Sequence, residues 1–233
     1  MSTALILSGG IAHDFPALSD RLVQLLAEEQ IDAAIRTDID AAARELDGID
    51  LLVVNMLRWR MLGDRHSADR EQWGLSLSEP ARASIAAWIQ NGGGMLAMHA
   101  SSICFDDWPQ WQTLCGARWD WTRAMHPPVG PAQITVYVDH HPIVAGLPAE
   151  FATDDEIYGF LDLADDVEPL LSGTHNGATH PLLWARSVGA GRVVHDTLGH
   201  YLPSYESPVH QLIVRRSARW ALGDSDTRVI AVS

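Results

Sequence analysis

Lysine is absent from this sequence, and all 16 basic residues are arginines. The chain therefore has no side chain that forms a Schiff base with a carbonyl substrate, and it lacks the phosphate-binding lysine of a P-loop. The 30 acidic residues outnumber the arginines, which gives a formal net charge of -14. Nucleic acids and anionic membrane surfaces bind basic proteins, so we expect neither as a partner.

Cysteine is also scarce, since Cys104 and Cys115 are the only two. No apolar run approaches the ~20 residues of a membrane-spanning helix, and the N-terminus enters a predicted strand without a charged or cleavable leader. These features predict a reduced, cytoplasmic protein. Hydrophobic residues make up 47% of the 233 residues, and no linker divides them, so we expect one domain over residues 1–223 and a tail over 224–233. The sequence leaves the oligomeric state open, a homo-oligomer included.

The most informative stretch covers residues 91–105. An amphipathic run at 80–90 predicts a helix, and the glycines at 92–94 end it, because glycine adopts left-handed backbone without steric cost. The apolar run at 95–98 then predicts a central strand that is buried on both faces. His99 follows, and small residues after it permit a sharp turn. The imidazole should therefore stand at the carboxyl edge of the sheet, where open α/β sheets bind ligands.

Short apolar runs that predict strands alternate with stretches that carry apolar side chains at helical spacing. The predicted strands are residues 3–7, 31–37 and 49–54, and the predicted helices are residues 18–29 and 41–46. This alternation predicts an α/β fold with a single-domain, doubly wound and mostly parallel sheet of the flavodoxin-like class. Within it, residues 5–7, 51–54 and 95–98 should be neighbouring parallel strands.

The rest of the chain predicts an antiparallel edge and a long connection. Residues 134–138 alternate apolar and polar side chains, as an antiparallel or edge strand does. Residues 58–77 are polar and aperiodic, so we expect a loop that covers the site or is mobile, with His66 on its solvated surface. Gly9 and Gly10 lack the G-x-G-x-x-G spacing of a dinucleotide site. The remaining predicted strands are 153–160, 168–171, 180–184 and 192–198, and a helix over 209–222 closes the chain.

Three of the eleven histidines are placed informatively. His13, His99 and His200 each follow the end of a predicted parallel strand, so all three should emerge at one edge of the sheet. A single histidine in such a place is more often a hydrogen-bonded structural residue. Three at the same edge favour a functional site.

Several motifs, in this order, resemble the trehalose-utilisation, or ThuA-like, family. They begin at His13-Asp14 and include the Gly-Gly-Gly-Met-Leu-Ala-Met-His-Ala run at 92–100. The others are Asp107-Trp108, His126-Pro, His141-Pro, Leu147-Pro, Asp155-Glu156-Ile-Tyr158, His180-Pro with Trp184, Gly191-Arg-Val, Gly199-His200 and Arg219-Trp220. The resemblance implies a class I glutamine amidotransferase-like fold and a role in the catabolism of trehalose, another disaccharide or a keto sugar.

The amidotransferases of that fold carry a catalytic cysteine at the turn after the central strand and a histidine after a late strand. By resemblance, His99 occupies the cysteine position and His200 the histidine position. An imidazole cannot form the glutamyl thioester that a thiolate forms, so the site should not be a glutaminase. Cys104 lies inside the following turn or helix, and we interpret it as a small buried hydrophobe.

The resemblance adds Glu156 and Tyr158 to the site. Together with His13, His99 and His200, Glu156 completes a ligand set for zinc or a related divalent ion. Without a metal, the same histidines can serve as general acid and base, with Glu156 orienting them and Tyr158 donating a hydrogen bond. The residues expected to contact substrate are His13, Asp14, Asp107, Trp108 and His126. His126 is equally explained as a further ligand or as a histidine that precedes a rigid proline turn.

Tryptophans and carboxylates follow His99 closely. The tryptophans are Trp108, Trp111, Trp119 and Trp121, and the interleaved acids are Asp106, Asp107 and Asp120. Most of these rings should pack in the core, but indole faces and carboxylates also bind sugars. An acidic, tryptophan-rich rim suits a neutral polyol better than a phosphate. The function that the resemblance implies is thus sugar catabolism, and the competing class is a non-catalytic sugar- or partner-binding module that kept the fold and lost its chemistry.

Glutaminase activity is expected to be absent, because no thiol occupies the turn after the central strand. A thiol-directed glutamine analogue should leave Cys104 and Cys115 unlabelled at the site, as measured by mass spectrometry of the intact protein. Stoichiometric labelling of Cys104 together with loss of function would contradict this assignment.

Overall fold

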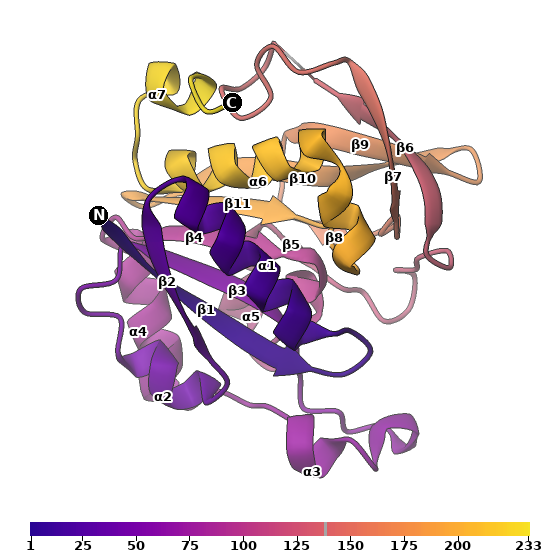
Figure 1. The fold of residues 1–233 in the computed structure, drawn as a ribbon. Helices are drawn as coiled ribbons and strands as arrows, with labels where there is room; N and C mark the ends of the chain where they lie inside the picture. The colour runs from indigo at the N-terminus through magenta and orange to yellow at the C-terminus, as the bar shows by residue number, and fades with distance from the viewer. Residues whose placement is uncertain (138) are drawn as a thin grey trace.

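The computed structural model describes residues 1–137 and 139–233 (Figure 1). A nine-stranded sheet extends across the molecule in the order β2-β1-β3-β4-β11-β10-β9-β6-β7. Its parallel half consists of β1 (Ser2–Gly10), β2 (Ile31–Arg36), β3 (Leu51–Leu57), β4 (Gly94–Met98) and β11 (Gly191–Asp196). Its antiparallel half consists of β6 (Gly130–Val136), β7 (Glu150–Asp155), β9 (Pro169–His175) and β10 (Ala178–Val188). Two short strands, β5 (Ala117–Arg118) and β8 (Asp162–Leu163), form a separate antiparallel pair.

The parallel half confirms the expected central strands. Leu5 pairs with Leu52, and Leu52 pairs with Met95, so β1, β3 and β4 are neighbours and run in one direction. Every residue of β3 and of β4 is buried, as their continuous apolar sequence requires of strands covered on both faces.

Helices cover both faces of the sheet, so the fold is doubly wound and of the flavodoxin-like class (Figure 1). Helices α1 (Phe15–Glu28) and α6 (Pro208–Ala221) pack on one face. The leucines of α1 are buried in the core on that face. Helices α2 (Ile39–Arg44), α4 (Glu79–Gln90) and α5 (Pro109–Cys115) pack on the other. Where α4 meets β11, a Cβ on Gly191 would lie 2.1 Å from the Ile89 carbonyl oxygen, so only glycine fits this approach.

Two expectations about extended segments need correction. Residues 134–138 were expected as one strand, but β6 begins at Gly130 and ends at Val136, and Val138 lies outside the described residues. Residues 153–160 were expected to continue as a strand, but β7 ends at Asp155. The reason is local, because the Asp155 carboxylate accepts the backbone N–H of Glu156 at 2.8 Å and turns the chain out of the ladder.

The segment expected as a loop at 58–77 contains two short helices, η1 (Asp64–His66) and α3 (Arg70–Trp73). Side-chain bonds to carbonyl oxygens fix it, since Arg58 donates to Trp73 and Arg70 donates to Met61. Met61 is fully buried, and α3 lies away from the sheet (Figure 1). His66 is half-buried against the ring of Trp59, at 5.0 Å between centroids, and is not a freely solvated residue.

The last residues also differ from the expected tail. Helix α7 (Asp226–Ile230) follows α6, and its Val229 side chain is fully buried. The guanidinium of Arg216 donates to the carbonyl oxygens of Ile230 and Val232, which holds the C-terminus against α6. In the described ranges no helix combines the length and the apolar character needed to cross a membrane.

A buried carboxylate connects the antiparallel edge to the loop after β11. Asp155 accepts the backbone N–H of Gly199 at 2.8 Å and that of His200 at 3.2 Å, and the Ser204 hydroxyl donates to it as well. Strand β7 lies four positions from β11 in the sheet order. The antiparallel half must therefore curl over the carboxyl ends of the parallel strands, as strongly twisted sheets do.

A buried histidine extends this connection. The ring of His210 lies 3.0 Å from a carboxylate oxygen of Asp196 through Nε2 and 3.0 Å from the Ser204 carbonyl oxygen through Nδ1. Burial alone lowers the pKa of His210, but the adjacent Asp196 carboxylate outweighs burial and raises it. Both ring nitrogens then carry protons. The Ser204, His210 and Asp196 set is not a hydrolytic triad, because Ser204 has no exposed surface.

Replacing Asp155 by asparagine is expected to lower the free energy of unfolding by about 2 kcal/mol or more, because buried backbone donors lose a charged acceptor. Urea denaturation measures the change. Asp154, exposed on the same strand, provides the matched control in Asp154→Asn, which should change stability by less than about 0.5 kcal/mol. Equal effects of the two substitutions would refute the role given to Asp155.

Candidate functional site

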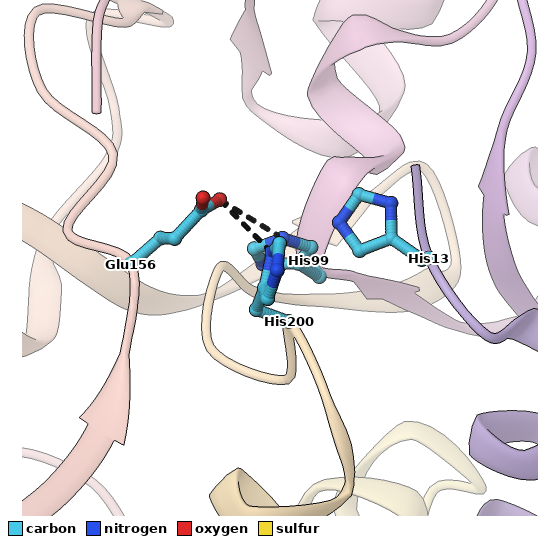
Figure 2. Close-up of side chains that lie close together, drawn as sticks. All are labelled: His13, His99, Glu156 and His200. Carbon is cyan, nitrogen blue, oxygen red and sulfur yellow. Dashed lines mark ion pairs between the residues drawn. The ribbon is translucent and has the colours of Figure 1, made fainter. Parts of the chain in front are cut away.

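Four side chains meet at the carboxyl ends of the strands (Figure 2). His13 lies between β1 and α1, His99 opens η2 (His99–Ile103) directly after β4, and His200 lies between β11 and η3 (Leu202–Glu206). Glu156 follows β7. One ligand atom from each of the four lies within 4.8 Å of the others. The prediction that three histidines converge at one edge is confirmed.

His99 sits in a strained turn. Its backbone φ is +39°, a left-handed conformation that residues with a Cβ seldom adopt. The small residues after His99 allow this turn. The Ser101 hydroxyl stabilises the turn, because it lies within hydrogen-bond distance, 2.7 Å, of the carbonyl oxygens of Val54 and Met98. His99 stands at the expected edge of the sheet, and it is buried there, because only 2% of the residue is accessible.

Backbone carbonyls fix the tautomers of two histidines. Nδ1 of His99 lies 2.7 Å from the carbonyl oxygen of Thr197, and Nδ1 of His13 lies 3.2 Å from that of Ile11. Since a carbonyl only accepts, each Nδ1 carries the proton and each Nε2 presents a lone pair to the cluster. Nε2 of His13 is buried and has no hydrogen-bond partner. Histidines that bind metals are typically oriented by such carbonyl contacts.

Glu156 approaches the histidines from the side opposite His13 (Figure 2). Its carboxylate lies 3.1 Å from Nδ1 of His200 and 3.7 Å from Nε2 of His99. The contact with His200 lacks the alignment of a hydrogen bond. Burial raises the pKa of Glu156, but the neighbouring imidazoles of His126, His200 and His99 more than offset burial and hold it well below its usual range. The carboxylate is therefore ionised.

Two of the histidines are neutral at neutral pH. Burial, with a smaller contribution from the nearby His200 ring, lowers the pKa of His13 to about 4. Burial likewise holds the pKa of His99 well below its ordinary value. A neutral imidazole beside an ionised carboxylate offers lone pairs to a cation or to a proton.

Tyr158 and His126 complete the wall of the site. The Tyr158 hydroxyl lies 3.1 Å from Nε2 of His99, and burial raises its pKa well above the ordinary value, so it stays protonated and donates to His99. His126 is more exposed and lies 2.9 Å from the Glu156 carboxylate through Nδ1. That carboxylate raises the pKa of His126, despite partial burial, so His126 holds a proton near neutral pH more readily than a free imidazole.

The other residues expected to contact substrate lie outside the cluster. Asp14 caps α1 by accepting the backbone N–H of Ala17, and Asp107 pairs with Arg82 of α4 at 2.7 Å. Trp108 packs in the core beneath α4 and α5. Both cysteines are buried and unpaired, and burial raises the pKa of each thiol to about 12, as expected of inert core residues.

Sequence analysis missed two residues that orient the cluster. Asp155 could have been identified from the sequence, because it precedes Glu156 in a motif that carries the family resemblance. Thr197 contributes only its backbone carbonyl oxygen to His99, so its side-chain identity gave no indication of this role.

Comparisons with solved structures agree with the fold. The chain is similar to a ThuA-like protein from Parabacteroides merdae, with a TM-score of 0.77 and 19% identity over 96% of this chain and 91% of that one. A ThuA-like protein from Bacteroides uniformis gives a TM-score of 0.71 and 18% identity, covering 94% of this chain and 91% of that one. A β-galactosidase from Bacillus circulans contains a similar unit, with a TM-score of 0.60 and 12% identity, over 97% of this chain and 31% of that one. At these identities the likeness shows the fold alone.

The sequence itself identifies the family. A comparison with curated protein sequences gives no match. Residues 3–221, however, match the family model that is described as ThuA, trehalose utilisation. Because this match spans nearly the whole chain, the protein belongs to the ThuA family, whose description indicates a role in carbohydrate utilisation.

Proposed function

We propose that this protein acts in carbohydrate catabolism, on trehalose, another disaccharide or a keto sugar derived from one, and that its site holds a divalent metal ion such as zinc. The ligands would be His13, His99, Glu156 and His200. The family supports the carbohydrate role, and the arrangement of the four side chains supports the metal.

One observation carries the metal proposal. His13 and His99 both satisfy Nδ1 with a backbone carbonyl and aim Nε2 into the cluster, and Nε2 of His13 is buried without a partner. A buried polar atom without a partner costs about 1–3 kcal/mol, so a ligand that satisfies it is favoured. Three imidazoles and an ionised carboxylate match the donors, and the number of donors, that zinc and related ions prefer.

A bound ion would act as a Lewis acid toward a sugar oxygen. The remaining chemistry belongs to the chain's own residues. His126 holds a proton at the exposed side of the site, within 2.9 Å of Glu156, and is placed to pass it to a sugar oxygen. Tyr158 supplies a second, permanently protonated donor. These groups suit proton transfer at a sugar carbon, as in hydrolysis, elimination or isomerisation.

A second candidate needs no metal. The Tyr158 hydroxyl donates to Nε2 of His99, so this nitrogen carries a lone pair and can accept a proton. In this alternative, His99 and His200 would exchange protons with the sugar directly, and Glu156 would orient His200.

His13→Ala is expected to weaken zinc binding by about 100-fold or more, because one of four ligands is lost. Isothermal titration of the metal-stripped protein with zinc, together with elemental analysis of the protein as purified, measures this change. His175→Ala, a histidine on β9 outside the cluster, should bind zinc as the wild type does. Wild-type protein that binds no divalent ion, or a His13→Ala variant that binds zinc normally, would eliminate the metal and leave the acid-base alternative.

The same preparations decide between an enzyme and a binding module. Turnover of a panel of disaccharides and their 3-keto derivatives is measured with added zinc and with chelator. Turnover that chelator abolishes supports the metal-dependent enzyme, and turnover that survives chelation supports the metal-free one. Sugar binding without any turnover in the panel would identify a non-catalytic module.

The metal-free protein should lose stability as the pH falls from 6.5 to 5. Burial depresses the folded-state pKa of His13 to about 4, so in this window the unfolded chain binds a proton that the folded chain does not. Stability therefore rises with pH across the window. In His13→Ala the slope of unfolding free energy against pH should be shallower, by up to about 1.4 kcal/mol per pH unit, in urea titrations. Identical slopes would show that folding leaves the pKa of His13 unchanged.

A further inference from the structure

A cavity of about 270 Å³ opens beside the histidine cluster, and Trp119 separates the two. The Trp119 ring lies 5.2 Å from that of Tyr158 and 6.0 Å from that of His126, measured between centroids. Its other surface lines the cavity. The rest of the wall includes Ser102, Trp108, Gln112, Asp120 and Trp121.

The tryptophans of the cavity are not all core residues. Trp111 is buried and donates its indole N–H to the Ser101 carbonyl oxygen. Trp121, by contrast, leaves 58% of its surface exposed. Its ring is tilted against that of Trp59, at 5.6 Å between centroids, and lies edge-on to that of Trp119, at 6.3 Å. An exposed indole at the mouth of a cavity presents a flat apolar face to a ligand.

A buried hydroxyl lacks a partner in the same cavity. Ser102 is 2% exposed and lines the wall, and its Oγ forms no hydrogen bond. Native proteins seldom leave such a group unsatisfied. The Oγ has no accessible surface of its own, so a ligand hydroxyl or an ordered water would reach it once the side chain turns toward the cavity. Ser102 follows His99 by three residues in η2, so the same turn supplies both the cluster and the cavity.

The charges around the cavity favour a neutral ligand. Among the described residues of this rim, Arg118 pairs with Asp162 at 2.7 Å, and Arg123 pairs with Asp120 at 2.9 Å. The guanidinium groups are therefore already neutralised by carboxylates. A phosphate or carboxylate would find no unpaired cation here, whereas sugar hydroxyls can donate to the Asp120 carboxylate.

We propose that this cavity is the subsite for the second ring of a neutral disaccharide whose first ring lies at the histidine cluster, an inference that rests on the proposed function. Its volume is below the about 300–1,000 Å³ of sites for drug-sized ligands, so it accepts one ring. Trp119 and Trp121 pack against the apolar face of that ring, and Ser102 and Asp120 bind its hydroxyls. Trp119 forms the wall between this subsite and the cluster, so the two sugar rings lie side by side along it.

The test compares sugars of one and two rings on the full chain with zinc present. Trehalose, sucrose, cellobiose and glucose are titrated into wild type, Trp121→Ala and Trp121→Phe by calorimetry. Trp121→Ala should weaken binding of the preferred disaccharide by about 2- to 13-fold, since an aromatic contact contributes about 0.5–1.5 kcal/mol. Trp121→Phe should keep most of the affinity. Glucose, which needs only the first ring site, should bind both variants as it binds wild type.

The control is Ile230→Ala, which removes an exposed apolar side chain of α7, 45% accessible, and should change neither affinity. Three results would overturn the subsite. Trp121→Ala could leave disaccharide affinity unchanged, it could weaken glucose binding as much as disaccharide binding, or no disaccharide of the panel could bind. Zinc affinity is measured on the same variants and should not change. A chain that binds no zinc but binds disaccharide through Trp121 would retain the subsite and lose only the metal.

Discussion

The hydrogen bonds of the Asp155 carboxylate hold the candidate site together. They join three backbone N–H groups from two distant segments, those of Glu156, Gly199 and His200. Two of these residues supply side chains to the cluster. Since β7 and β11 are not neighbours in the sheet, no ladder of backbone bonds could keep the two side chains in register. A single buried anion, supported by Ser204 and the protonated His210, takes the place of that ladder.

Burial and carbonyl contacts then determine what the cluster can do. The Thr197 carbonyl oxygen accepts from Nδ1 of His99, and the Ile11 carbonyl oxygen accepts from Nδ1 of His13, so both tautomers are fixed. Burial lowers the pKa of both rings and keeps them neutral. The imidazoles in turn keep Glu156 ionised. Each group thus holds the protonation state that either a cation or a proton-transfer reaction requires. The strained turn at His99 thus holds a neutral imidazole whose Nε2 lone pair can serve as a ligand or as a base.

Sequence patterns predicted the parts of this structure that depend on local chemistry. Short apolar runs located β1, β3 and β4, and the geometry of parallel strands then brought His13, His99 and His200 to one edge. Glu156 could be placed only through the family resemblance, because its position depends on how the antiparallel half curls over the sheet. The burial of His99 could not be predicted either, since the walls around it, including Tyr158, come from segments far along the chain. Asp107 and Trp108 are residue types that sugar sites use, and the sequence therefore suggested that they contact a sugar. In the structure the Asp107 carboxylate pairs with Arg82, and the Trp108 ring packs in the core.

The order in which the cluster residues occur in the chain has a consequence for folding. His13 and His200 lie near opposite ends of the sequence, and Glu156 reaches them only after the antiparallel half has closed over the parallel strands. Contacts of such long sequence separation form late, once loop-closure entropy has been overcome. A partly folded chain therefore presents only part of the cluster, and all four side chains come together only in the native state. Occupancy of the cluster would consequently report that folding has finished, and a bound ion would stabilise only the finished molecule.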